Sequence, residues 1–262
     1  MDLGIRGRKA IVNGGSAGMG KGSALALARE GVDLYVSARG EERLVAACAE
    51  IRAETGSPVT PVVADHSSDE GRAKILAACP EPDILVQTCS PPQFTGDFNA
   101  ITKDDWRESL DITLLGPIQF MQQLIPGMVD RKWGRIVNIG TAGAKFPSER
   151  RILSGAPRAA LANYTHAVSK VVARHNVMIN TIMPGMFHTE GIEHLMNEIA
   201  EANGTSYREE VARVVKDHSI AAGDFGDAND LGAFVAMFCS EFARYLVGQS
   251  LAIEGGVTNS TF

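Results

Sequence analysis

Residues 9–22 read KAIVNGGSAGMGKG, and this stretch decides the fold. A short apolar run leads into five glycines within nine residues, and an amphipathic run, Ser23–Glu30, follows. This order predicts a strand, a glycine turn and a helix. Glycines let the backbone approach a diphosphate, and the free N–H groups at the start of the helix can bind it. The stretch therefore predicts a dinucleotide-phosphate loop, with an ordinary glycine-rich turn as the alternative.

Composition narrows the class of protein. The chain has 262 residues, 45% hydrophobic and 21% charged, which suits one globular α/β domain. Its net charge of −6 gives no reason to expect nucleic acid or an anionic membrane as partner. Four scattered cysteines form no CxxC pair, so we expect reduced thiols and no metal site. The chain starts without an apolar signal core and has no membrane-length apolar run, which favours a cytoplasmic location.

Short apolar runs alternate with longer helix-like runs along the chain. The alternation predicts a single-domain, doubly wound parallel sheet over residues 1–262, with helices on both faces. Ligands of such sheets bind at the carboxyl ends of the strands. The expected strands are Lys9–Asn13, Asp33–Ala38, Pro58–Ala64, Ile84–Gln87, Arg135–Ile139, Val177–Met183 and Ser250–Glu254. Further expected helices are Glu41–Thr55, Lys103–Val129 and Leu153–Arg174.

With these elements in place, the chain resembles the short-chain dehydrogenases/reductases over nearly its whole length. The resemblance rests on NGGSAGMG after the first strand, Asp65 after the third, and RIVNIGT in the fifth. INTIMPGMFHT after the sixth strand extends it, as do FGDANDLGAFVAMF and YLVGQSLAIEGG near the C-terminus. The resemblance implies a Rossmann-type domain that binds NAD(H) or NADP(H) and moves a hydride at a carbonyl or alcohol.

The resemblance also implies which residues hold the cofactor. Arg39 ends the second strand, where an acidic residue would favour NAD(H); its planar fork of donors suits the 2′-phosphate of NADP(H). We therefore favour NADP(H), with NAD(H) as the alternative, because Arg39 can also be a plain surface arginine and Ala17 lacks the basic side chain of many NADP-binding relatives. Asp65 resembles the carboxylate near the adenine amino group, or caps the next helix. The other implied contacts are Gly14, Ser16, Gly18, Met19, Gly20, Thr88, Arg158, Pro184, Gly185 and Thr189.

All four catalytic positions implied by the resemblance carry substitutions. Thr113 stands for the asparagine, Thr141 for the serine, Ser154 for the tyrosine and Arg158 for the lysine. Arg158 keeps the charge needed to bind a ribose but cannot release a proton. An aliphatic hydroxyl is a far weaker acid than a phenol, whose pKa is about 10. Ser154 and Arg158 are four residues apart, so they share one helix face and can act together.

Several other residues near these positions allow two interpretations. Tyr164 is interpreted as packing, because its spacing does not reproduce a Tyr-x-x-x-Lys pair. Cys89 is interpreted as packing rather than as a nucleophile. His188 is either a proton donor or a structural histidine, and Glu149 either a substitute acid or a solvated charge. Pro157 predicts that Ser154 and Arg158 lie at the start of their helix, because proline is tolerated in a first turn.

Two segments are expected to shape a distinctive site. Gln87–Cys89, with Ser90 and Pro91–Pro92, replaces the family's Asn-Asn-Ala-Gly, so the ribose pocket there is expected to be rebuilt. Residues 186–220 are expected to form a substrate lid. Within it, Ser206 and Glu209 predict a capping box with a helix starting at Tyr207. Asn203–Gly204 predicts a hinge or turn.

Three functions remain open at this point. The first is an NADP(H)-dependent oxidoreductase acting on a small-molecule carbonyl or alcohol, with 3-oxoacyl-type compounds among the candidates. The second is a non-redox enzyme on the same scaffold, such as a lyase, dehydratase or dehalogenase. The third is a catalytically silent, cofactor-binding subunit of a hetero-oligomer. The resemblance further implies a homotetramer or homodimer, formed through residues 103–129 and 153–174 and the C-terminal strand.

Overall fold

A seven-stranded parallel sheet forms the centre of the protein, in a computed structural model that describes residues 1–89 and 97–258. The strand order is β3-β2-β1-β4-β5-β6-β9, and every pairing is parallel. The strands are β1 Lys9–Asn13, β2 Asp33–Ala38, β3 Val59–Val63, β4 Ile84–Gln87, β5 Gly134–Ile139, β6 Val177–Pro184 and β9 Ser250–Ile253. The prediction of a single-domain, doubly wound parallel sheet is confirmed.

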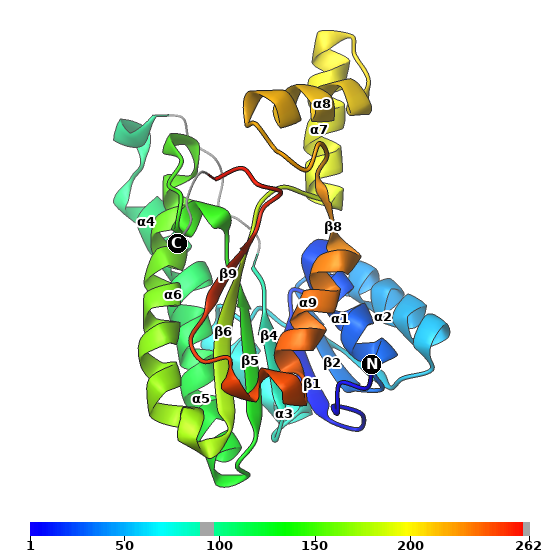
Figure 1. Cartoon of the computed structure of the whole chain (residues 1–262), viewed down its shortest axis with the longest axis vertical. Coiled ribbons are helices and arrows are strands. Elements are labelled where there is room, and N and C mark those ends of the chain that lie inside the picture. Colours follow the sequence, from blue (N-terminus) through cyan, green and yellow to red (C-terminus); the bar gives the residue numbers. More distant parts are fainter. Residues whose placement is uncertain (90–96, 259–262) are drawn as a thin grey trace.

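Helices cover both faces of this sheet (Figure 1). One face carries α1, α2 and α9, and the other carries α3, α5 and α6, as the two core clusters show. The nine α-helices of the described residues are α1 Gly18–Arg29, α2 Glu41–Thr55, α3 Asp69–Ala78, α4 Lys103–Leu110, α5 Gly116–Asp130, α6 Ile152–Val172, α7 Glu190–Asn203, α8 Tyr207–Asp217 and α9 Ala228–Cys239. None of the helices described is long and apolar enough to cross a membrane.

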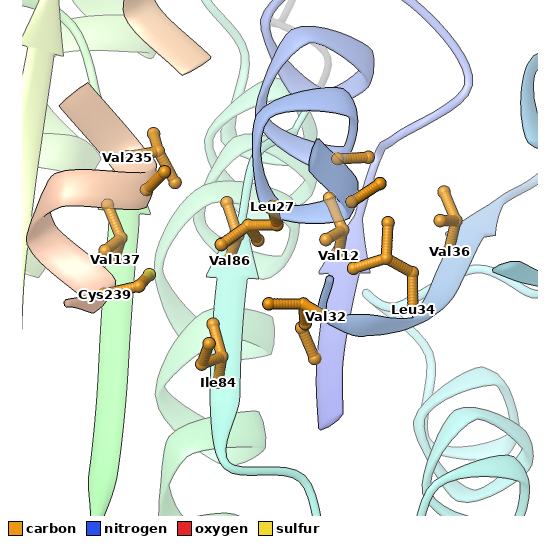
Figure 2. Packing of buried hydrophobic residues seen from close by; sticks show 14 of the residues in the cluster. Val12, Leu27, Val32, Leu34, Val36, Ile84, Val86, Val137, Val235 and Cys239 are labelled. Carbon is orange, nitrogen blue, oxygen red and sulfur yellow. The ribbon is translucent and has the colours of Figure 1, made fainter. Parts of the chain in front are cut away.

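Successive residues of each central strand enter opposite cores. In β1, Val12 packs with α1 and α9, whereas Ile11 packs with α5 and α6. In β4, Val86 likewise belongs to the core beside α1 and α9, and Leu85 to the core beside α5 and α6. Figure 2 shows the first of these clusters, in which Leu27 and Val235 lie over the strands. Because side chains of a strand alternate between faces, a strand covered on both sides must be apolar throughout, which is why these runs could be found in the sequence.

The predicted long helix over Lys103–Val129 is divided in three. A capping box at Thr102 and Asp105 starts α4, a π-helical turn spans Asp111–Leu115, and α5 then begins at Gly116. π-Turns are inserted into helices mostly at functional sites. Here the turn places Ile112 in the wall of the large cavity described below.

The prediction that Pro157 lies in a first helical turn is wrong. Helix α6 starts at Ile152, so Pro157 is its sixth residue. Without an N–H group, Pro157 cannot bond to the carbonyl of Leu153, four residues earlier. The hydroxyl of the fully buried Ser109, in α4, donates to that carbonyl instead. A side chain 44 residues away therefore allows a proline in the second turn.

We expect Ser109→Ala to destabilise the fold by about 1–3 kcal/mol, because the buried Leu153 carbonyl would lose this donor. Pro157→Ala offers a matched control, since alanine restores an N–H group at the position that normally bonds to Leu153. The loss caused by Ser109→Ala should therefore be smaller in the Pro157→Ala background, as measured by denaturant unfolding of all four proteins. Equal losses in both backgrounds would contradict this account.

Residues 186–220 and the segment after them form a separate small cluster above the sheet (Figure 1). Helices α7 and α8 pack around Met196, Val211, Ile220 and Phe225. The predicted capping box at Ser206 is present, and α8 starts at Tyr207 as expected. Gly204 ends α7 with a φ of +66°, so the Asn203–Gly204 pair forms a turn. Short strands β7 Phe187–His188 and β8 Gly226–Asp227 pair at the base of the cluster.

Candidate active site

A cavity of about 470 Å³ opens at the carboxyl ends of β1, β2, β3 and β4. This is the edge at which ligands of doubly wound sheets bind, and the volume suits a nucleotide-sized ligand. Its wall includes most of the cofactor positions expected from the sequence: Gly14, Ser16, Gly18, Met19, Gly20, Arg39, Asp65, Thr88 and Thr189. Ala17, Arg43, His66, Ser67, Cys89, Ile112 and Glu190 also line it.

The glycine loop leaves backbone donors free at this cavity. Gly14 has a φ of +72° and Gly18 a φ of +51°, values that favour glycine. A Cβ atom on Gly20 would lie 2.2 Å from the Gly14 carbonyl oxygen, so the turn needs glycine there too. Ala17 precedes α1 and gives it no side-chain cap. The first N–H groups of α1 are therefore left for a ligand, and the helix dipole favours an anionic one.

Two arginines stand over one part of the cavity wall. Arg39 follows the end of β2, and Arg43 lies in the first turn of α2. Arg43 Nη1 lies 3.4 Å from Glu190 Oε2, an exposed ion pair whose contribution to stability is small. Two guanidinium groups on one wall give this part of the cavity the charge that a phosphate monoester needs.

Asp65 does not cap the next helix; the alternative of a capping role is wrong. The N-cap of α3 is Ser68, whose hydroxyl accepts from Gly71 N. Asp65 Oδ1 instead accepts from the backbone and the hydroxyl of Ser67, at 2.9 and 2.6 Å. Burial raises the pKa of Asp65, but these two bonds and the charge of Arg39 together bring it below its ordinary value. Asp65 is thus an ionised acceptor at the cavity wall.

Ser154 and Arg158 form a buried pair on α6. Arg158 Nη1 donates to Ser154 Oγ at 2.6 Å and to the Ser154 carbonyl at 3.0 Å. Arg158 Nη2 donates to Cys89 Sγ at 3.2 Å, so Cys89 packs against this guanidinium through a polar contact. A guanidinium only donates, hence Ser154 Oγ is an acceptor in this bond and its own hydrogen can point elsewhere.

The other two expected catalytic residues differ in their surroundings. Thr141 Oγ1 accepts from Gly143 N at 3.3 Å, which likewise leaves its hydrogen free to donate. Thr141 begins a short turn, Ala142–Ala144, and α6 packs close to it. A Cβ on Gly155 would lie only 2.8 Å from the Gly143 carbonyl oxygen. Thr113 is fully buried, and its hydroxyl donates to the Ser109 carbonyl at 2.6 Å. Thr141 and Ser154 therefore offer hydroxyl donors, whereas the hydrogen of Thr113 is already bonded.

Several residues that the sequence suggested for the site do not line the large cavity. Pro184 ends β6, and Gly185 N donates to the Ile253 carbonyl. His188 forms hydrogen bonds with Tyr207 at 2.6 Å and Asp224 at 3.1 Å. These bonds favour the interpretation of His188 as a structural histidine. Tyr164 packs against the core beside α5, as interpreted from its spacing, and Glu149 is exposed. Ser90 and Pro91–Pro92 lie outside the described residues.

The sequence did not single out His66 or Arg43. Arg43 could have been noticed, because it follows Arg39 by four residues and lies in the first turns of a helix that starts at the cofactor edge. His66 carried no local signal beyond its place after Asp65. The structure places His66 at a second cavity, of about 10 Å³. His66, Thr88 and Cys89 line both cavities, and Arg158 lines the smaller one.

Residues 8–200 match the family described as short chain dehydrogenase. The chain belongs to this family, which assigns it to the oxidoreductases. It is 27% identical to a 3-oxoacyl-[acyl-carrier-protein] reductase from Aquifex aeolicus, over 98% of this chain and 100% of the relative. An uncharacterized oxidoreductase from Bacillus subtilis is 25% identical over the whole of both chains. The structure of L-sorbose reductase from Gluconobacter frateurii, complexed with NADPH and L-sorbose, is similar with a TM-score of 0.94 and 25% identity, over 99% of this chain and 100% of that one.

Proposed function

We propose that this protein is an NADP(H)-dependent oxidoreductase that acts on the carbonyl or alcohol group of a small molecule. The observation that carries the proposal is the lining of the 470 Å³ cavity, which combines a glycine loop, two arginines and an ionised aspartate. The same lining includes Cys89, which accepts a hydrogen bond from Arg158. The NADPH complex of the sorbose reductase, similar over nearly the full chain, supports it.

The residues present fit an NADP(H) molecule. The free N–H groups after Ala17 would bind its diphosphate, and Arg39 with Arg43 would bind the 2′-phosphate. Asp65 would accept from the adenine amino group, and Thr88 and Thr189 supply further polar groups along the wall. When bound, NADPH supplies a hydride to a carbonyl carbon. Arg158 contacts Cys89, which lines the cavity, and it would hold the ribose on the nicotinamide side.

Ser154 and Thr141 would polarise the carbonyl oxygen of the substrate. Each hydroxyl oxygen already accepts a bond from a fixed donor, so each hydrogen is available to the substrate. Fixed donors aimed at an oxygen that gains negative charge lower the barrier, and the nearby Arg158 cation adds to this. Burial and the charge of Arg158 both lower the pKa of the Arg151 guanidinium. Because neither hydroxyl is a strong acid, the proton would come from water or from the substrate.

We expect Ser154→Ala to lower kcat/KM for carbonyl reduction at least tenfold, because one donor to the developing oxyanion is commonly worth about 10²–10³ in rate. Ser154→Tyr should raise kcat/KM, since a phenol adds general acid catalysis. The measurement is NADPH oxidation with a panel of ketones and aldehydes. Ser148→Ala, an exposed serine in the loop before α6, is the matched control and should leave the rate unchanged.

The outcomes separate the three candidate functions. Equal rates for the wild type and both Ser154 variants would remove this residue from the mechanism. NADPH binding without turnover of any carbonyl would favour the silent subunit or the non-redox enzyme. Failure to bind NADPH would overturn the cofactor assignment itself.

We also propose that the protein assembles with itself, as a homodimer or homotetramer. Large apolar side chains are exposed on and around α9 and β9: Phe234, Met237, Phe242, Tyr245 and Leu251. Their position supports an interface along the C-terminal strand, one of the three segments expected from the family resemblance.

A further inference from the structure

The small cavity beside Arg158 adjoins the large one, because His66, Thr88 and Cys89 line both. Its volume is about 10 Å³, at the lower limit for one water molecule and too small for any larger ligand. Three of its lining residues carry a buried polar atom with no hydrogen-bond partner in the described residues: His66 Nε2, Gln87 Oε1 and Arg158 Nε. Buried polar atoms without partners are costly, so three around one cavity call for a bound group.

The chemistry of two of these atoms is fixed by their neighbours. Gln87 Nε2 donates to Asn138 Oδ1 at 2.9 Å and to the Pro117 carbonyl at 3.3 Å, so its amide cannot be turned around. Gln87 Oε1 is therefore an acceptor. The two terminal nitrogens of Arg158 are used on Ser154 and Cys89, and Nε carries one more hydrogen to donate.

His66 supplies the third contact as an acceptor. Burial lowers the pKa of His66, the charges of Arg39 and Arg72 lower it further, and Asp65 only partly opposes them. The ring is therefore neutral at neutral pH, with one nitrogen protonated and one able to accept. Arg158 and Cys89 are the other ionisable residues that share the small cavity with it.

We propose that this cavity holds one ordered water molecule, which accepts from Arg158 Nε and donates to Gln87 Oε1 and His66 Nε2, so that His66 positions Arg158. The three bonds use both hydrogens of the water and one of its lone pairs, a typical set for buried water. The assignment requires that His66 carry its hydrogen on Nδ1. It makes His66 a positioning residue, acting through water on the guanidinium that holds Ser154.

The water and the tautomer can be tested without any cofactor. In ¹⁵N-histidine-labelled protein, His66 should show a protonated Nδ1 and an unprotonated Nε2 at neutral pH, with its signals assigned by their loss in His66→Gln. A high-resolution crystal structure should show a water about 2.7–3.2 Å from the three atoms. A protonated Nε2, or a cavity without a water peak, would overturn the assignment.

The effect on Arg158 rests on the proposed function and is tested by NADPH affinity. We expect His66→Leu, which removes the acceptor, to raise the Kd for NADPH at least fivefold. His66→Gln, which retains an acceptor, should recover most of that loss, with thermal unfolding of both variants as the check on folding. Equal losses in the two variants would show that ring shape, not the acceptor, matters, and would overturn the positioning role. If the wild type fails to bind NADPH, the proposed function fails, while the nitrogen spectra and the crystal structure still decide the water site.

Discussion

Replacing Arg39 with aspartate is expected to weaken NADPH binding by roughly 10²–10³-fold, because charge-assisted bonds to the 2′-phosphate are replaced by repulsion between like charges. NADH has no phosphate at this position, and aspartate can accept from its ribose hydroxyls, so the NADH affinity should stay constant or rise. The measurement is a calorimetric or fluorescence titration of both nucleotides with both proteins. The expected result is a reversal of the cofactor preference.

Arg29→Asp serves as the control for the change in net charge. Arg29 is exposed on α1 and pairs with Glu54, away from the residues that line the cavity. Reversing its charge should leave the ratio of NADPH to NADH affinity unchanged. Tighter binding of NADH by the wild type, or an unchanged preference in Arg39→Asp, would remove Arg39 from the cofactor site and the NADP(H) assignment with it.

Gly232→Ala should destabilise the protein by about 2–4 kcal/mol, although alanine normally stabilises the interior of a helix relative to glycine. Gly232 lies in α9 where this helix crosses α1, and a Cβ there would lie 2.2 Å from the Gly22 carbonyl oxygen. The crossing is reciprocal, since a Cβ on Gly22 would lie 2.3 Å from the Ala228 carbonyl oxygen. Both obstacles are backbone atoms, so the helices themselves would have to separate.

The matched control for this prediction is Gly191→Ala in α7, where a Cβ would meet no atom of the described residues within 4 Å. Here alanine should stabilise the protein by up to about 1 kcal/mol. Thermal unfolding at one protein concentration measures both variants. A Gly232→Ala protein as stable as the wild type would mean that α1 and α9 are not held at this distance.

The strands could be predicted from the sequence because burial on both faces is a local requirement. Lys9–Asn13, Asp33–Ala38 and Ile84–Gln87 have the bounds expected from their apolar runs. Alternation of strands and helices also fixed the parallel direction, because each crossover needs a helix. The order of the strands was out of reach, since it depends on which face each connecting helix covers.

The parts of the site made by one continuous segment could likewise be predicted, whereas those made between segments could not. The glycine loop and Arg39 lie within short stretches, and both line the cavity. The contact of Arg158 with Cys89 joins residues 69 positions apart, and nothing in either local sequence indicates it. His66 was missed for the same reason, because only folding brings it to the small cavity that Arg158 also lines.

The bond between Ser109 and Leu153 links the formation of one helix to the presence of another. Helix α6 cannot satisfy its second turn from its own backbone, so that turn is complete only when α4 has docked. Opening of α4 would release the Leu153 carbonyl and leave it without this donor. The two helices should thus open and close as one cooperative unit, and their amide hydrogens should exchange with solvent at a common rate.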